Sequence, residues 1–196
     1  MTRLVLLRHG ETDWNREGRY QGQADPPLNE EGRHQAEALV GRLAGRGMET
    51  IYSSDLRRAS ETARILAARL GLPLMLDPRL REIHQGEWEG RWVEDIMQTY
   101  PEAWALRWKE PLRARAPGGE SILEVEARVS QAVEEIASVH PNGVVLIVSH
   151  ALALASLRCR AHHVPLEGVY QWLLENGAVD EIDWPPDPAR GTGEGG

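Results

Sequence analysis

The sequence predicts a three-layer α/β/α sandwich around a central, mostly parallel sheet, with a small helical lid inserted in it. Three observations support this prediction. Short apolar runs of strand length alternate with stretches of helical periodicity, as in folds built on a parallel sheet. Residues 144–149 (VVLIVS) are β-branched and apolar on both faces, which is typical of a central parallel strand. Two buried-type strands are followed directly by a histidine, His9 and His150.

The spacing of apolar residues predicts where each helix and strand lies, and helix-capping residues predict where the helices begin and end. We expect strands at residues 3–8, 50–53, 74–76, 144–149 and 178–183, with a turn at 13–15. A helix capped by Asn29 is expected to end near residues 45–47. Further helices are expected at residues 56–70, 120–139 and 151–160, the first of them ended by Gly71.

A length of 196 residues suits one ordinary domain, which we assign to residues 1–184. Between about 84 and 118 the periodicity degrades, tryptophans gather and prolines break the chain into short helices. We interpret this stretch as a lid insertion. Residues 185–196, rich in Pro and Gly, are expected to be a disordered tail.

Composition excludes several classes of protein. The net charge of −8 offers no basic excess for nucleic acid or an anionic membrane, so we expect neither partner. A single cysteine, Cys159, excludes a disulfide framework and a cysteine-based zinc site. We find no targeting segment and no membrane span, and therefore expect a cytoplasmic enzyme. Arginine replaces lysine almost everywhere, Lys109 being the one lysine, so an arginine alone is weak evidence of function.

Ligands of such folds bind beyond the carboxyl ends of the strands. Arg8 and His9 end the first strand, Arg58 begins the helix after the second, Glu82 follows the third, and His150 ends the strongest strand. Two arginines, two histidines, a carboxylate and a helix N-terminus together describe an anion site with a nucleophile and a proton donor.

Each residue type suits phosphoryl transfer. Arginine matches phosphoryl oxygens bidentately and keeps its charge. A neutral imidazole can attack phosphorus, and a carboxylic acid can protonate the departing alkoxide. We find no metal-ligand spacing, and arginines can neutralise the charge that a metal would otherwise offset, so we expect no cofactor and no metal.

The segment Leu7-Arg8-His9-Gly10-Glu11-Thr12 resembles the RHG signature of the histidine phosphatase superfamily, the phosphoglycerate mutase-like phosphatases. Other segments resemble this family in its order and cover roughly residues 3–183. They are residues 15–28 (with RYQG), 53–63 (SSDLRRA), 80–90 (LREI and GEWEG), 118–121 (GGES) and 148–150 (VSH).

The resemblance implies roles for the residues that end the predicted strands. His9 would be the phosphorylated nucleophile and Glu82 the proton donor. Arg8, Arg58 and His150 would hold the phosphoryl group.

The resemblance to the family also implies binding roles for residues other than the two histidines and the two arginines. Asn15 would help to hold phosphate, while Gln21 and Gly22 would contact phosphate or substrate. Ala151 and Leu152 replace residues whose backbone N–H groups bind the phosphate in relatives. That contact survives a change of side chain.

The family contains phosphatases and mutases, which differ in where the phosphohistidine delivers its phosphate. The resembling mutases carry a basic residue after the acid and a longer, strongly basic insertion. Here Ile83 follows Glu82, and the short stretch 91–118 offers only Arg107, Lys109, Arg113 and Arg115. We therefore favour metal-independent hydrolysis of small phosphate monoesters, in the branch that resembles broad-specificity and ribazole-phosphate phosphatases.

Other functions stay open at this point. They are a cofactor-dependent phosphoglycerate mutase, a regulatory phosphate-binding module without catalysis, and a protein phosphatase acting on phosphohistidine or phosphotyrosine. The tryptophan-rich insertion favours a covered site, so we expect a small phosphorylated metabolite as the partner. Family members often form dimers, and a homodimer is the corresponding expectation for this chain.

Overall fold

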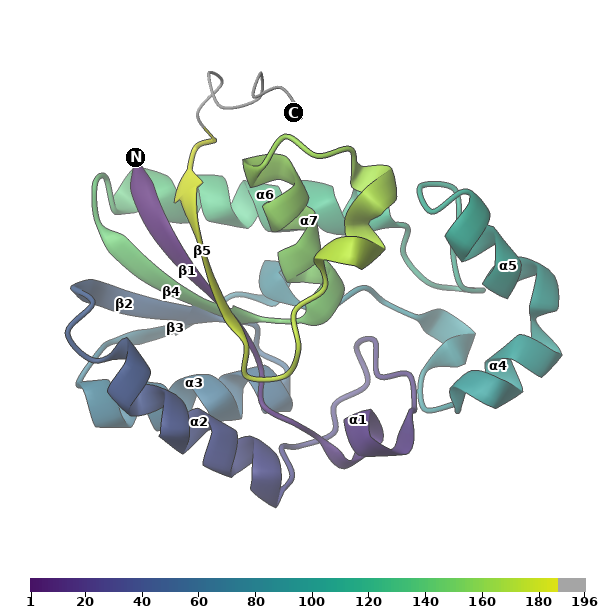
Figure 1. Ribbon diagram of the computed structural model, residues 1–196, viewed down its shortest axis with the longest axis horizontal. Helices are drawn as coiled ribbons and strands as arrows, with labels where there is room; N and C mark the ends of the chain where they lie inside the picture. Colours follow the sequence, from purple (N-terminus) through teal and green to yellow (C-terminus); the bar gives the residue numbers. More distant parts are fainter. Residues whose placement is uncertain (187–196) are drawn as a thin grey trace, which may run out of the picture.

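The computed structural model describes residues 1–186, so the predicted tail lies almost wholly outside the described residues. A five-stranded sheet forms the centre of the molecule, in the order β3-β2-β4-β1-β5 (Figure 1). Its strands are β1 (Thr2–Arg8), β2 (Met48–Ser53), β3 (Leu74–Leu76), β4 (Val144–Ser149) and β5 (Val179–Trp184). The first four pair in parallel and β5 runs antiparallel to β1, which confirms the predicted mostly parallel sheet.

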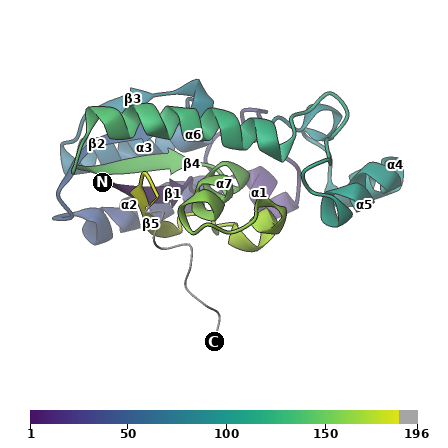
Figure 2. The same cartoon turned by 90° about the horizontal axis from the view of Figure 1, so that it is seen from above.

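Helices cover both faces of the sheet (Figures 1 and 2). One face carries α2 (Glu30–Leu43) and α3 (Arg57–Leu70), and the other carries α6 (Ile122–Val139) and α7 (Ala151–Ala161). Asn29 caps α2 and Gly71 ends α3 in the left-handed conformation, both as predicted. Within residues 1–186, no helix combines the length and apolar character needed to cross a bilayer.

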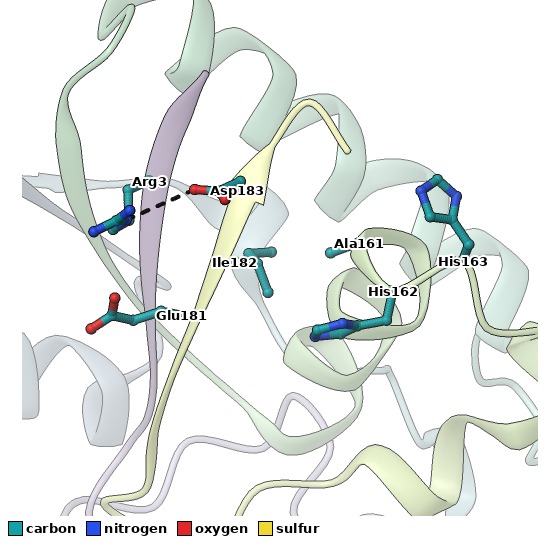
Figure 3. Close-up of a pocket in the computed structure, with 7 residues that line it drawn as sticks. All are labelled: Arg3, Ala161, His162, His163, Glu181, Ile182 and Asp183. Atoms are coloured by element: carbon teal, nitrogen blue, oxygen red, sulfur yellow. Dashed lines mark ion pairs between the residues drawn. The ribbon is translucent and has the colours of Figure 1, made fainter. Parts of the chain in front are cut away.

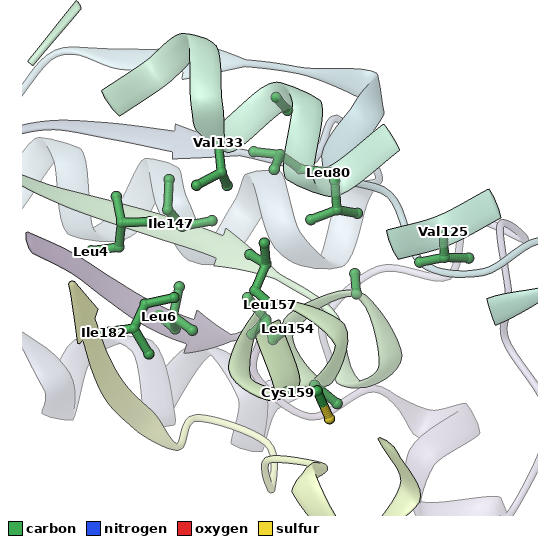
Figure 4. Packing of buried hydrophobic residues seen from close by; sticks show 14 of the residues in the cluster. Leu4, Leu6, Leu80, Val125, Val133, Ile147, Leu154, Leu157, Cys159 and Ile182 are labelled. Atoms are coloured by element: carbon green, nitrogen blue, oxygen red, sulfur yellow. The ribbon is translucent and has the colours of Figure 1, made fainter. Parts of the chain in front are cut away.

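Strand periodicity divides the core into the two expected layers. In β1, Leu4 and Leu6 face α6 and α7, whereas Val5 and Leu7 face α2 and α3. The apolar cluster under α6 and α7 is drawn in Figure 4. Strand β4 alternates in the same way and is buried over nearly its whole length, which is why its sequence is apolar on both faces.

Parallel pairing of β1 with β4 brings the two histidines together. In this register Arg8 lies opposite Ser149, so the next residue of each strand leaves the sheet at the same edge. The rings of His9 and His150 lie 5.1 Å apart between centroids. Residues 141 positions apart in sequence thus begin one site.

The stretch predicted as a lid contains a 3-10 turn, η2 (Gly86–Trp88), and two short helices, α4 (Val93–Thr99) and α5 (Pro101–Lys109). These helices stand to one side of the sheet, beyond its carboxyl edge (Figures 1 and 2). Trp88, Ile96 and Ala116 form a separate buried cluster beneath them. The insertion therefore has a small core of its own.

Three other segments differ from the sequence expectation. The predicted turn at 13–15 is the start of a short helix, α1 (Asp13–Glu17). Thr12 and Asn15 form a capping box that stabilises this helix, although it is too short to show periodicity. Two 3-10 turns, η1 (Pro78–Leu80) and η3 (Leu166–Trp172), were also not predicted.

The loop after β1 packs backbone to backbone on the first turn of α2. A β-carbon on Gly32 would fall on the carbonyl oxygen of Glu11, and one on Gly10 would fall on that of Gly32. Neither obstacle is a flexible side chain that could turn away. This close approach fixes the position of the loop that carries His9.

We expect Gly32→Ala to lower the free energy of unfolding by about 1–3 kcal/mol, because the added methyl forces backbone atoms apart. Gly41→Ala is the matched control in the same helix, since a β-carbon there meets nothing within 4 Å. Alanine at that position should stabilise the helix by about 0.5–1 kcal/mol. Urea unfolding followed by circular dichroism measures both; equal effects at the two positions would contradict the close-packing argument.

Candidate active site

A cavity of about 210 Å³ opens beyond the carboxyl ends of β1 and β4. Eight of the nine residues predicted for the site line it, from Arg8 and His9 to Ala151. The ninth, His150, is fully buried and lies against His9. The structure therefore brings all the predicted residues into one neighbourhood.

Two hydrogen bonds fix the tautomer of His9. Its Nδ1 lies 2.7 Å from the carbonyl oxygen of Gly10, which can only accept, so Nδ1 carries the ring proton. Its Nε2 accepts from the Nε–H of Arg58 at 3.2 Å. The lone pair of the imidazole is therefore on Nε2, beside a guanidinium.

The surroundings keep His9 uncharged. Burial is the largest influence and lowers the pKa of His9 well below its usual range; the charges of Arg58 and Arg8 lower it further. The pKa of His150 is lowered in the same way, first by burial and then by the Arg58 charge. Both imidazoles are neutral near pH 7.

Two arginines approach His9 from different elements. Arg58, in the first turn of α3, is almost fully buried and donates to the carbonyl oxygens of Gly22 (2.7 Å) and Ala24 (2.8 Å). Arg8 donates to the carbonyl oxygen of Leu174 at 2.6 Å. Burial lowers the pKa of both guanidiniums, that of Arg58 to about 10, so both stay charged at neutral pH.

His150 is held by Ser54, which sequence reasoning included only as part of a motif. Ser54 Oγ lies 2.8 Å from His150 Nε2 and accepts from the N–H of Leu56 at 3.3 Å. The other ring nitrogen, Nδ1, is buried without a hydrogen-bond partner.

Thr12 orients the amides of Asn15 and Gln21. Its backbone N–H donates to the side-chain oxygen of Asn15 at 3.1 Å, and its hydroxyl donates to that of Gln21 at 3.0 Å. With their oxygens held there, the NH₂ ends of both amides are available to an anion in the cavity. Gly22 follows with φ +52°, and a β-carbon on it would fall on the Glu89 carboxylate. A side chain at this position would therefore disturb the cavity wall.

Glu82 faces the arginines and also closes the N-terminus of α7. Its carboxylate accepts from the backbone N–H groups of Leu152 and Ala153, each at 3.2 Å. The Leu152 N–H, expected to bind phosphate, is bonded to the Glu82 carboxylate in this structure. Ala151 remains at the cavity wall.

Residues that sequence reasoning missed hold these groups in place. Arg128 of α6 forms an ion pair with Glu120 and donates to the carbonyl oxygens of Arg81 (2.6 Å) and Glu82 (2.8 Å). Asn176 donates to the carbonyl oxygen of His9 at 3.1 Å. Both come from segments without motif signals, and arginine is too common here to be informative.

A larger hollow, of about 560 Å³, lies on another part of the molecule. It is bordered by Arg3, His162, Glu181 and Asp183 beside β5 (Figure 3). None of the predicted site residues borders it. Among residues 1–186, no group of three or more His, Cys, Asp or Glu side chains is arranged to hold a metal ion.

A family model covers nearly the whole chain. The family model described as "Histidine phosphatase superfamily (branch 1)" matches residues 4–191. The chain belongs to this superfamily.

Individual members are similar over nearly the whole chain. "Phosphoserine phosphatase 1" of Hydrogenobacter thermophilus is 37% identical, covering 93% of this chain and 86% of its own. "Probable phosphoglycerate mutase GpmB" of Serratia proteamaculans is 34% identical, covering 98% and 90%. The curated relatives thus bear both phosphatase and mutase names.

Solved structures of the superfamily share the fold. Bacillus stearothermophilus YhfR gives a TM-score of 0.88 at 38% identity, covering 93% of this chain and 91% of its own. The alpha-ribazole phosphatase from Shigella flexneri gives 0.84 at 32%, covering 92% and 90%. These matches confirm the predicted fold, and the phosphatase-named members support a phosphatase.

Burial of neutral histidines makes stability depend on pH. The unfolded chain takes up a proton on each histidine as pH falls through about 6.5, whereas folded His9 resists protonation. The unfolded state then binds more protons, so stability falls with pH. We expect His9→Asn to reduce the loss of unfolding free energy between pH 7.5 and 5.5 by up to about 1.4 kcal/mol.

Urea unfolding at the two pH values measures this difference. His34→Asn is the control, because His34 is exposed on α2 and should change the pH dependence little. An unaltered pH dependence in His9→Asn would mean that the folded protein protonates His9 as readily as the unfolded chain.

Proposed function

We propose that this enzyme hydrolyses small phosphate monoesters without a metal, through a phosphohistidine intermediate on His9. The observation that carries the proposal is the uncharged His9 ring, whose lone pair is on Nε2 beside two buried guanidiniums. An unprotonated nitrogen in a cationic cavity suits nucleophilic attack on an anionic phosphoryl group.

In the first step, the Arg58 Nε–H gives up its hydrogen bond to His9 Nε2 for a phosphoryl oxygen, and Nε2 attacks phosphorus as the bond from phosphorus to the ester oxygen breaks. Arg8 and Arg58 neutralise the charge on the phosphoryl oxygens. His150 Nε2 lies 2.8 Å from the Ser54 hydroxyl. In this mechanism the hydroxyl donates to Nε2, so that the ring proton is on the buried Nδ1, and a phosphoryl oxygen would supply the partner that Nδ1 lacks. The NH₂ groups of Asn15 and Gln21 complete the set of donors.

The leaving oxygen needs a proton, which Glu82 supplies from its acid form. In the second step the Glu82 carboxylate takes a proton from water, water attacks phosphorus, and the bond from phosphorus to His9 breaks. Inorganic phosphate and the alcohol are the products, and both residues return to their starting states. The backbone N–H groups at the start of α7 hold the carboxylate in position between these steps.

Water as the final acceptor is favoured over a second phosphoglycerate. Ile83 stands where the mutases carry a basic residue, and the insertion is short. The similarity to a phosphoserine phosphatase and to an alpha-ribazole phosphatase points the same way. The similarity to a probable phosphoglycerate mutase makes the mutase reaction the second candidate.

The first experiment measures phosphate release from p-nitrophenyl phosphate in excess EDTA. We expect turnover by the wild type and a loss of at least about 1000-fold in His9→Ala, because His9 is the one imidazole among the described residues that line the cavity. His34→Ala, an exposed histidine, should retain activity. Acid-labile ³²P on the wild-type protein and not on His9→Ala would identify the intermediate.

Turnover that persists without His9 would refute the nucleophile assignment. Transfer between 2- and 3-phosphoglycerate that depends on bisphosphoglycerate and exceeds hydrolysis would favour the mutase. Activity that EDTA abolishes and Mg²⁺ restores would refute metal independence.

Replacement of the proton donor should affect substrates unequally. Glu82→Gln keeps the size of the side chain but cannot give or take the proton. We expect kcat/KM for an alkyl ester such as glycerol 3-phosphate to fall by about 100- to 10 000-fold. The loss for p-nitrophenyl phosphate should be smaller, because its leaving group departs without a proton.

Glu87→Gln is the matched control, since Glu87 lies nearby in the chain but bonds to Tyr100 and does not line the cavity. Steady-state kinetics on both esters separates the effects. Equal losses on the two esters in Glu82→Gln would contradict its role as proton donor.

A further inference from the structure

Arg107 is a buried cation at the cavity that the proposed reaction does not use. It lies on α5, is 7% exposed, and lines the cavity together with Arg8, Arg58 and Glu82. Within residues 1–186, no ion pair joins it to an acidic side chain. A charge buried without a counter-charge is costly, so its position calls for an explanation.

Two of its nitrogen atoms, Nε and Nη1, are buried without a hydrogen-bond partner. Among the described residues, the other side-chain atoms of this kind are Arg8 Nε, His150 Nδ1, Trp88 Nε1 and Trp184 Nε1, of which the first two lie at the proposed phosphoryl site. Unpartnered buried donors are rare in folded proteins and call for a ligand, a water or an ion. A phosphoryl group at His9 would supply partners for those of Arg8 and His150, but would leave those of Arg107 without one.

Aromatic rings surround this guanidinium on several sides. Its central carbon lies 4.8 Å from the ring centre of Tyr170, 5.0 Å from Trp104, 5.1 Å from Trp108 and 5.3 Å from Tyr20. Ring faces attract a cation but offer no in-plane hydrogen-bond acceptor. The cage therefore holds the side chain in place, and beside a hydrogen bond to Tyr170 it leaves Nε and Nη1 without an acceptor.

We propose that Arg107 binds a carboxylate on the substrate, and that the enzyme prefers phosphate esters of hydroxy acids to esters without a second anionic group. This inference rests on the proposed phosphatase function. In it, Arg8 and Arg58 take the phosphoryl end of the substrate and Arg107 takes the other end.

A carboxylate fits the observations better than a second phosphoryl group. The cavity of about 210 Å³ is small, and one phosphoryl group must already lie at His9. A carboxylate is compact and accepts two hydrogen bonds from a guanidinium. Arg107 and Tyr170 line the cavity from α5 and η3, which are separate from the elements that carry Arg8 and Arg58.

The test compares 3-phosphoglycerate with glycerol 3-phosphate. The first ester has a carboxylate where the second has a hydroxymethyl group. We expect the wild type to favour 3-phosphoglycerate in kcat/KM by at least about 10-fold. Arg107→Met, which keeps an unbranched side chain in the aromatic cage, should abolish this preference. The loss of kcat/KM should be smaller on glycerol 3-phosphate than on 3-phosphoglycerate.

Two further variants complete the series. Arg113→Met removes an exposed arginine of the same insertion, which is paired with Glu110, and should keep the preference. Arg107→Lys retains the positive charge but cannot donate two parallel hydrogen bonds to a carboxylate, so it should keep part of the preference. Thermal unfolding shows whether Arg107→Met folds. If it does not, Arg107→Lys serves as the test in its place. An undiminished preference for 3-phosphoglycerate in either folded variant overturns the proposal.

Other outcomes are equally decisive. Equal losses on both esters in Arg107→Met would place Arg107 at the transferred phosphoryl group and overturn the proposal. No preference in the wild type, with both esters turned over, would overturn it as well.

Failure of the phosphatase function itself is distinguished by a binding measurement. Calorimetric titration of the two esters into His9→Ala measures how much the carboxylate contributes to binding affinity when no catalysis takes place. Tighter binding of 3-phosphoglycerate that disappears in the His9→Ala, Arg107→Met double variant supports the subsite even if no ester is hydrolysed. Equal binding of both esters overturns it.

Discussion

The hydrogen bond from Arg58 to His9 joins the main parts of the site. Arg58 lies in the first turn of α3, His9 follows β1, and the same guanidinium holds the backbone of the loop at Gly22 and Ala24. Because an arginine donates and never accepts, this contact leaves the His9 lone pair on Nε2. Burial of the pair, in turn, keeps the imidazole uncharged. Together with the Gly10 carbonyl and with burial, this interaction determines the tautomer and the charge state of His9.

The supporting structure satisfies buried donors with backbone carbonyls and places few carboxylates near the phosphoryl site. Arg8 and Arg58 donate to carbonyl oxygens, which orient a guanidinium without cancelling its charge. Glu82 is the carboxylate at the cavity wall, and helix amides hold it. Arg128, by contrast, is neutralised by Glu120 and fixes the segment that carries Glu82. Positive charge is therefore kept where an anion would bind and neutralised where the role is structural.

The sequence predicted the sheet, the covering helices and the neighbourhood of the site, because these depend on local patterns. A continuous apolar run gives β4, and the carboxyl ends of parallel strands meet at one edge. Contacts made by isolated side chains were beyond prediction. The partner of Ser54, the carbonyls bound by Arg128 and the amides taken by Glu82 follow from tertiary packing and leave no periodic signal. Arg107 was noted only as one of the few cations of the insertion, since burial is what distinguishes it.

Charge at the site must also be reconciled with the acidity of the whole chain. The formal net charge is −8, yet four arginines line a cavity of about 210 Å³. At physiological ionic strength, exposed charges are screened beyond about 8 Å, whereas charges inside a protein are screened much less. The surface acids therefore act weakly on an anion that has entered, and the nearby guanidiniums dominate its energy. Local arrangement, more than the overall charge, makes this acidic protein suited to an anionic ligand.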